Sequence, residues 1–126
     1  MLTLGHFRLN LNTMIIKRAH EVSEEMPSLE GTKECTVRWL IAEKDSAKHY
    51  AMRLFELQPS GIIPLHSHED KEHEIFIIEG NGVLNDGKKN IQVMRGDVIF
   101  IEPDEKHSFV NNSDGVLKFI CVIPIV

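Results

Sequence analysis

Residues Gly61 to Gly80 read GIIPLHSHEDKEHEIFIIEG, and this segment carries the clearest structural signal in the chain. It holds His66, His68 and His73, followed by a run of β-branched and aromatic residues. Side chains at positions i and i+2 of a strand point to the same face, so His66 and His68 are expected to face the same way. Imidazole nitrogens gathered on one face of a strand are common ligands of transition metals. The stretch therefore predicts a metal site built on β-strands.

A second stretch, GDVIFIEPDEKH from Gly96 to His107, supplies a fourth histidine. The spacing alone leaves open whether His107 joins the first three in one site. An alternative register remains open for the first stretch, because a single bulge reverses the alternation of side chains along a strand. In that register Glu72 or Glu74 binds the metal and His73 faces outward.

Short segments rich in β-branched and aromatic residues recur along the chain, and turn sequences separate them. Asp86-Gly87 suits a tight hairpin with positive φ, and Pro59-Ser60-Gly61 reads as a break between strands. One short helical turn is expected within residues 19–26. The predicted strands are 35–41, 51–57, 74–79, 82–85, 91–94, 98–101, 108–110 and 117–123. This pattern predicts an all-β, antiparallel sandwich or barrel.

Alternation along the strands also assigns an interior. It places Arg53 and Phe55 inside with Glu56 outside, and it places Phe119 and Cys121 inside with Lys118 facing water. An inward arginine needs a partner, because an unpaired buried charge is costly. Arg53 is therefore either half of a structural ion pair or a clamp for an anionic substrate. Cys121 either fills space as a small apolar residue or takes part in the site.

Length and composition favour one domain over residues 1–126, with a barrel core at about 35–126. Residues 1–13 are expected to be peripheral or an extended start. The formal net charge of −5 argues against nucleic acid or an anionic membrane as partner. The sequence shows no signal peptide and no apolar span of about 20 residues, so a cytoplasmic location is expected. Cys35 and Cys121 are then predicted to be free thiols.

The two histidine stretches resemble the two motifs of the cupins, which are small jelly-roll β-barrels. In the first motif His73 stands where the family usually has a glutamate, and Gly61 precedes His66 by one residue fewer than usual. In the second motif Glu102 and Asp104 replace the usual proline and glycine. The positions that match are Gly61, His66, His68, Gly80, Gly96, Pro103, His107 and Asn111.

The resemblance implies an antiparallel jelly-roll barrel (a double-stranded β-helix) with a metal held by His66, His68, His73 and His107. Small single-domain cupins with four histidines are associated with manganese and oxidative chemistry, so Mn or Fe is expected, and Ni, Cu or Zn also fit the donors. Four neutral imidazoles leave the charge of a divalent metal uncompensated, which favours an anionic further ligand. Two octahedral positions stay open for substrate or an oxygen species.

These features predict a dioxygenase-like oxidoreductase that activates oxygen or peroxide towards a small organic substrate. Arg53 and Cys121 are the candidate catalytic residues, and Ile63, Phe109 and Phe119 are the expected pocket residues. One alternative is a Lewis-acid isomerase or lyase for a sugar or keto acid, although the sequence assigns no carboxylate to the interior as a general base. The other alternative is a small-molecule or metal-binding protein without turnover.

A homodimer is also expected. The segments EIFII and VIFI, residues 74–78 and 98–101, are apolar on both faces. A sheet with one face in water would leave some of these side chains exposed, so something else is expected to cover them. Within the cupin resemblance, that cover comes from two barrels packed face to face.

Overall fold

Antiparallel strands make up most of the computed structural model, which describes residues 2–3, 6–7 and 14–126. Apart from a pair of two-residue strands, the segment expected to be peripheral (1–13) lies outside the described residues. The strands are β1 (Leu2–Thr3), β2 (His6–Phe7), β3 (Glu24–Glu25), β4 (Lys33–Ile41), β5 (Tyr50–His66), β6 (His73–Glu79), β7 (Asn81–Asn85), β8 (Asn90–Met94), β9 (Val98–Ile101), β10 (His107–Val110) and β11 (Leu117–Pro124). Two 3-10 turns, η1 (Ala19–Glu21) and η2 (Glu43–Asp45), complete the described elements.

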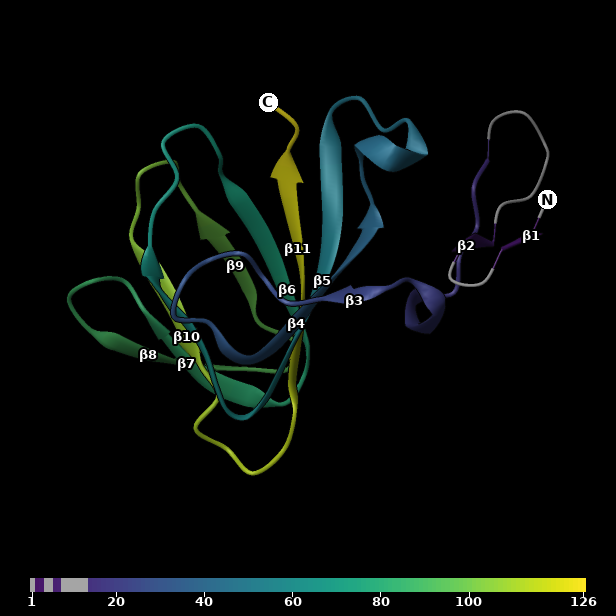
Figure 1. Ribbon diagram of the computed structural model, residues 1–126. Coiled ribbons are helices and arrows are strands. Elements are labelled where there is room, and N and C mark those ends of the chain that lie inside the picture. The colour runs from purple at the N-terminus through teal and green to yellow at the C-terminus, as the bar shows by residue number, and fades with distance from the viewer. Residues whose placement is uncertain (1, 4–5, 8–13) are drawn as a thin grey trace.

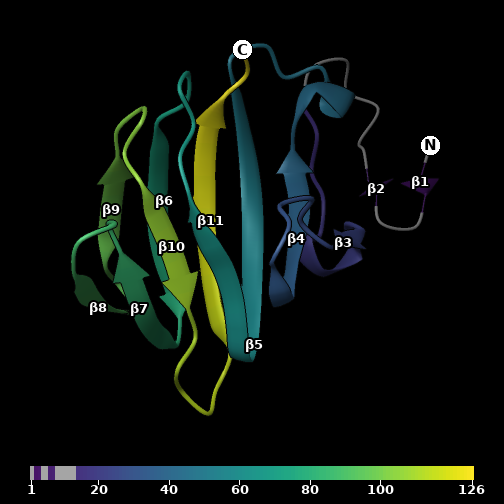
Figure 2. The ribbon, with the colours of Figure 1, turned by 60° about the vertical axis from the view of Figure 1, so that its left-hand side comes forward.

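The main sheet runs in the order β8-β7-β10-β5-β11-β6-β9, and β4 pairs with β5 and with β3 (Figures 1 and 2). β5 belongs to both halves of this curled sheet. Residues 50–57 pair with β11, whereas His66, Ile63 and Ile62 pair with β10. All described pairs are antiparallel, so the chain forms the predicted all-β jelly-roll barrel. Among the described helices, none has the length and apolar character needed to cross a membrane.

The sequence predicted a break at Pro59-Ser60-Gly61, and here it was wrong, because β5 bends instead of ending. Ser60 takes a positive φ of 73°, and its N–H donates to the carbonyl oxygen of Asn111 at 2.9 Å. A Cβ on Gly61 would lie only 2.7 Å from the carbonyl oxygen of Glu34 and 2.8 Å from that of Gln58. The glycine therefore allows one strand to pass from one half of the barrel to the other.

The interior follows the predicted alternation. Leu57, Ile77 and Leu117 are fully buried, and Phe119 and Cys121 are each 2% exposed. Lys118 and Glu56 lie on the outer face, where they form an ion pair with each other. Both cysteines are buried free thiols, as expected. The helical turn expected within 19–26 is shorter than that range, because η1 ends at Glu21 and β3 begins at Glu24.

Candidate metal centre

Four histidines come together where β5 ends and where β6 and β10 begin. His66 ends β5, His73 begins β6, His107 begins β10, and His68 lies in the loop between β5 and β6. Their ring centroids are 4.3 Å apart for His66 and His107, 4.9 Å for His73 and His107, 5.0 Å for His66 and His68, and 5.3 Å for His68 and His73. The structure thus brings together all four histidines that the sequence singled out.

Three of the four present a tighter set of ligand atoms. One ring nitrogen each from His66, His68 and His107 lies within 4.8 Å of the others. The Nδ1 of His66 lies 2.7 Å from the carbonyl oxygen of Pro64, and the Nδ1 of His107 lies 2.9 Å from that of Glu105. A carbonyl only accepts, so each Nδ1 carries the proton and Nε2 keeps a free lone pair. Fixing the tautomer in this way is how metal-binding histidines are usually oriented.

His73 adds a fourth ring beside these three. It is 5% exposed, and its buried Nδ1 has no hydrogen-bond partner among the described residues. A buried polar nitrogen without a partner is unfavourable in a folded protein. An unpartnered nitrogen at this place therefore fits a site that takes up a metal ion, and the residues present fit a divalent transition metal.

Burial favours the neutral form of His68, His73 and His107. Desolvation, together with the nearby His107 and Arg53, lowers the pKa of His73 to about 3. Desolvation also lowers the pKa of His107 to about 4, and it lowers that of His68. Neutral imidazole is the form that binds a metal, so at neutral pH no proton has to leave before an ion enters.

The carboxylate that follows His73 on β6 faces away from the other histidines. Glu74 pairs in register with Phe100 and Val122 and lies on the outer side of β6. Desolvation, followed by contact with Glu72, raises the pKa of Glu74 to about 7. The structure therefore has His73 inside and Glu74 outside, and it does not adopt the alternative register with a glutamate ligand.

A cavity of about 540 Å³ opens beside the histidines. Arg53, Cys121, Ile63, Phe109 and Phe119 all line it, as the sequence analysis expected of its candidate catalytic and pocket residues. Its remaining wall includes Val37, Trp39, Phe55, Ile75 and residues 25–30. Trp39 could have been found, because alternation from Cys35 through Val37 carries it to the inner face. Nothing in the sequence of residues 25–30 pointed to the pocket.

Arg53 lies within this cavity without a carboxylate. Its Nη2 donates to the Sγ of Cys121 at 3.1 Å, and its guanidinium carbon lies 5.3 Å from the ring centroid of Trp39 and 4.9 Å from that of Phe55. No Asp or Glu of the described chain forms an ion pair with it. The structural ion pair considered from the sequence is therefore absent from this part of the molecule. Burial raises the pKa of the Cys121 thiol, which keeps it protonated at neutral pH.

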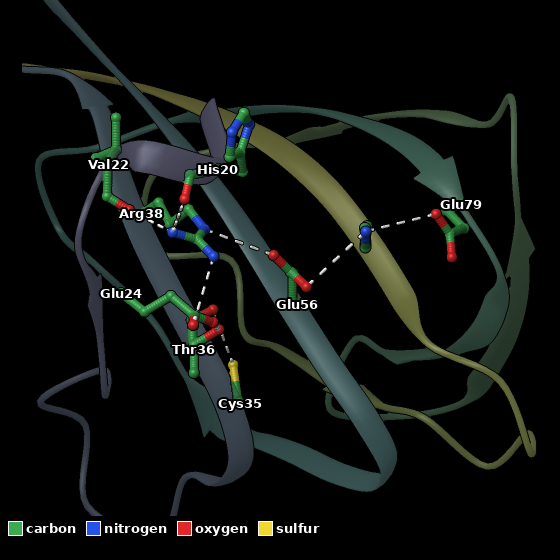
Figure 3. A network of polar contacts seen from close by, with 9 residues as sticks. His20, Val22, Glu24, Cys35, Thr36, Arg38, Glu56 and Glu79 are labelled. Atoms are coloured by element: carbon green, nitrogen blue, oxygen red, sulfur yellow. Dashed lines mark hydrogen bonds and ion pairs between the residues drawn. The ribbon is translucent and has the colours of Figure 1, made fainter. Parts of the chain in front are cut away.

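Polar contacts on the outer side of β4 hold the segment that precedes the pocket wall (Figure 3). Arg38 donates to the carbonyl oxygens of His20 and Val22 and forms ion pairs with Glu24 at 3.4 Å and Glu56 at 3.7 Å. These contacts fix the chain before Glu25 along β4. The next residues, 25–30, are thereby brought to the pocket.

Comparison with known proteins agrees with this architecture. The family described as "Cupin domain" matches residues 53–123. The oxalate-binding protein of Thermotoga maritima is 31% identical over 114 residues, which cover 87% of this chain and 93% of that protein.

Two solved structures are similar over most of their length. The polyketide cyclase RemF from Streptomyces resistomycificus has a TM-score of 0.84 at 35% identity, covering 89% of this chain and 80% of RemF. A predicted oxalate decarboxylase from Thermotoga maritima has a TM-score of 0.78 at 29% identity, covering 89% of this chain and all of that one.

Proposed function

The chain belongs to the cupin family, and on this basis we propose that it is a metal-dependent enzyme that binds a small anionic organic molecule directly on a divalent transition metal. His66, His68, His73 and His107 would hold the ion, with Mn or Fe as first candidates and Ni, Cu or Zn as alternatives. When bound, such an ion supplies Lewis-acid polarisation of a coordinated oxygen and, for Mn or Fe, electron transfer.

One observation carries the proposal: the donors around the cavity are neutral. All four histidines are imidazoles, and the carboxylates lining the cavity among the described residues are Glu25 and Glu30, which are both exposed. The charge of a divalent ion is therefore left for the substrate to balance. An anionic oxygen group such as a carboxylate or enolate suits this requirement.

The chain's own residues shape the rest of the binding site. Phe55 and Phe109 each stack on Phe119, with ring centroids 5.1 Å and 4.6 Å apart. The three rings form an apolar surface in the cavity that the histidines also line, and such a surface keeps water away from a bound substrate. The cavity volume of about 540 Å³ is typical of sites for small organic ligands.

Two reaction classes fit this centre. Oxidation by oxygen or peroxide is compatible with the described cavity lining, whose carboxylates, Glu25 and Glu30, are exposed. An isomerase or lyase would instead need a general base at the substrate. Lewis-acid conversion without redox change is supported by the relatives, since RemF is a polyketide cyclase and the Thermotoga protein binds oxalate. Both classes share the anionic, oxygen-rich substrate.

Metal analysis of protein purified without added metal, together with aerobic and anaerobic substrate screens, tests the proposal. We expect about one transition metal ion per chain, removable by a chelator with loss of activity. Substrate-dependent consumption of oxygen or peroxide with Mn or Fe supports oxidation. Tightly bound zinc, with turnover but no oxygen consumption, supports the Lewis-acid class. A chain that takes up none of the five metals contradicts the proposal.

A further inference from the structure

Arg53 is a cation inside the cavity that lacks a counter-ion in the described chain. A guanidinium carries five N–H donors, and the Sγ of Cys121 is the acceptor that one of them meets. The Nε of Arg53 is buried and has no hydrogen-bond partner among the described residues. A partly buried charge with unpaired donors is costly unless something else supplies the missing acceptors.

Other partly buried cations of this protein are neutralised by carboxylates. Lys17 forms a 2.6 Å ion pair with Asp45, and Arg38 forms ion pairs with Glu24 and Glu56. Arg53 instead lies against the rings of Trp39 and Phe55. Contact with aromatic rings partly compensates the charge and orients the guanidinium plane. It does not satisfy the in-plane N–H groups, which form the fork that binds a carboxylate with two hydrogen bonds.

The position of Arg53 relative to the histidines follows from the strand register. Arg53 on β5 pairs with Cys121 on β11, and Cys121 pairs with Ile75 on β6. His73 lies two residues before Ile75 on the same face, which is about 6.6 Å along the strand. Arg53 therefore lies one row of inward side chains from His73 along the strands and two strands across, at about 4.8 Å per strand. Both side chains line the cavity, so a molecule a few carbon atoms long can span the gap that remains between them.

We propose that Arg53 forms a second anion subsite, so that the preferred ligand is a small dicarboxylate with one carboxylate on the metal and the other on Arg53. The inference rests on the proposed function, since the metal holds the first carboxylate. Arg53 is then the residue that selects dianionic over monoanionic ligands of the same length.

Trp39 provides a direct reporter for this subsite. It is the sole tryptophan of the chain and lines the cavity beside Arg53. The full chain loaded with zinc is titrated with dicarboxylates from malonate to glutarate and with monocarboxylates of equal carbon number, and Trp39 emission is followed. At least one dicarboxylate should bind about tenfold or more tightly than its monocarboxylate partner. Oxalate serves as a reference, because both its carboxylates can chelate the metal.

Variants distinguish binding at Arg53 from a general effect of the protein's positive charges on anions. Arg53→Gln should weaken dicarboxylate binding about tenfold to a hundredfold while metal content and monocarboxylate affinity stay unchanged. The dicarboxylate affinity of Arg53→Lys should lie between those of the wild type and Arg53→Gln, because lysine keeps the positive charge and loses the fork of in-plane N–H donors. Arg95→Gln, which removes an exposed cation, should match the wild type. In the absence of ligand, Arg53→Gln should unfold no more easily than the wild type.

Several outcomes would overturn the inference. One is a dicarboxylate preference that survives in Arg53→Gln, and another is a large loss of stability in that variant without ligand, which would mean a structural role. If the variant does not fold, the wild-type titration decides, since no dicarboxylate preference there refutes the subsite. Monocarboxylate binding without such a preference refutes the subsite and leaves the proposed function standing. If no anion binds the metal-loaded wild type, both fail.

Discussion

At the scale of single residues, His73 is the position where the first cupin motif departs from its usual glutamate. Its ring is buried beside His107, and Glu74 lies on the opposite side of the strand. We predict that His73→Ala weakens metal binding at least about tenfold, because it removes a ligand that no carboxylate can replace from the outer face. Metal content after dialysis against a competing chelator measures the effect.

Glu74→Ala is the matched control, since it changes the neighbouring residue without altering the inner face. It should retain metal like the wild type. Normal metal content in His73→Ala together with loss in Glu74→Ala would mean that β6 has the opposite register.

Acid should destabilise the metal-free protein through the same histidines. In the folded state the pKa is lowered to about 3 for His73 and about 4 for His107, whereas in the unfolded chain both return to an ordinary value of about 6.5. Above that value both states are neutral and the histidines cost no stability. As the pH falls from about 6.5 towards 4, the unfolded chain binds protons that the folded protein refuses, so unfolding is favoured.

Urea unfolding of the metal-free protein at several pH values checks this expectation. The free energy of unfolding should fall across the window from about 6.5 to 4. The fall should be smaller in His73→Gln and unchanged in His49→Gln, which alters an exposed histidine outside the site. An equal fall in the wild type and His73→Gln would contradict the assignment.

Single residues also show which parts of the site are legible in a sequence. His66, His73, His107 and Arg53 could be predicted, because alternation fixes the face of a strand residue once the register is known. His68 was found by its spacing from His66, although it lies in the loop after β5 and not on a strand as expected. Residues 25–30 could not be predicted. Their place depends on Arg38 bonding to the backbone carbonyls of His20 and Val22, and every residue carries a carbonyl. The residue types at the accepting positions therefore do not reveal these contacts.

At the scale of elements, the strands were predictable and their continuity was not. The segments of β6 to β11 match the predicted ranges to within one residue at each end. β5 is longer than expected, because a proline, a positive φ at Ser60 and a crowded glycine bend the strand without ending its pairing. The sequence shows the turn-forming residues Pro59, Ser60 and Gly61. It does not show that β5 continues beyond them, because that part of the strand pairs with β10, which is distant in sequence.

Three glycines allow a graded test of the turns between strands. Gly115 has open space at its Cβ position, Gly96 has open space and a φ of +95°, and Gly80 has a φ of +82° with the carbonyl oxygen of Val116 in the way. Substitution by alanine should cost within about 0.5 kcal/mol at Gly115, about 1–2 kcal/mol at Gly96, and more than that at Gly80.

Chemical unfolding of the three alanine variants measures this order. Equal losses at Gly80 and Gly96 would mean that the β6–β7 turn relaxes away from Val116. A large loss of stability in Gly115→Ala would mean that the new methyl group meets a neighbour in the folded protein.

At the scale of the whole molecule, part of the outer face of the barrel is a patch of exposed apolar side chains, with Glu74 among them between Phe100 and Val122. Phe76 pairs with Val98 on one side and Ile120 on the other, and Val122 pairs with Met52, so the apolar side chains are continuous across β9, β6, β11 and β5. Val98 is 77% exposed, Phe100 57% and Phe76 47%. A contiguous patch of this kind on a small domain typically marks a protein interface.

We therefore predict a homodimer formed through this outer face, as the resemblance to cupins led us to expect. Beside the patch, ion pairs link Lys118 to Glu56 and Glu79, so positive and negative charges alternate at its margin. A second copy can approach such a margin without the repulsion that a single sign of charge would produce. Light scattering after size exclusion should give twice the chain mass of 14.4 kDa.

Phe76→Glu and Phe100→Glu should shift the protein to monomers with unchanged circular dichroism, since each places a charge in the patch without touching the core. Met94→Glu is the matched control, because Met94 is 59% exposed but lies on β8 at the far edge of the sheet. A wild type that stays monomeric at high concentration would exclude this interface. Equal dissociation by Met94→Glu would mean that the contact uses another face, because the substituted charge would then act at β8 and not across β9, β6, β11 and β5.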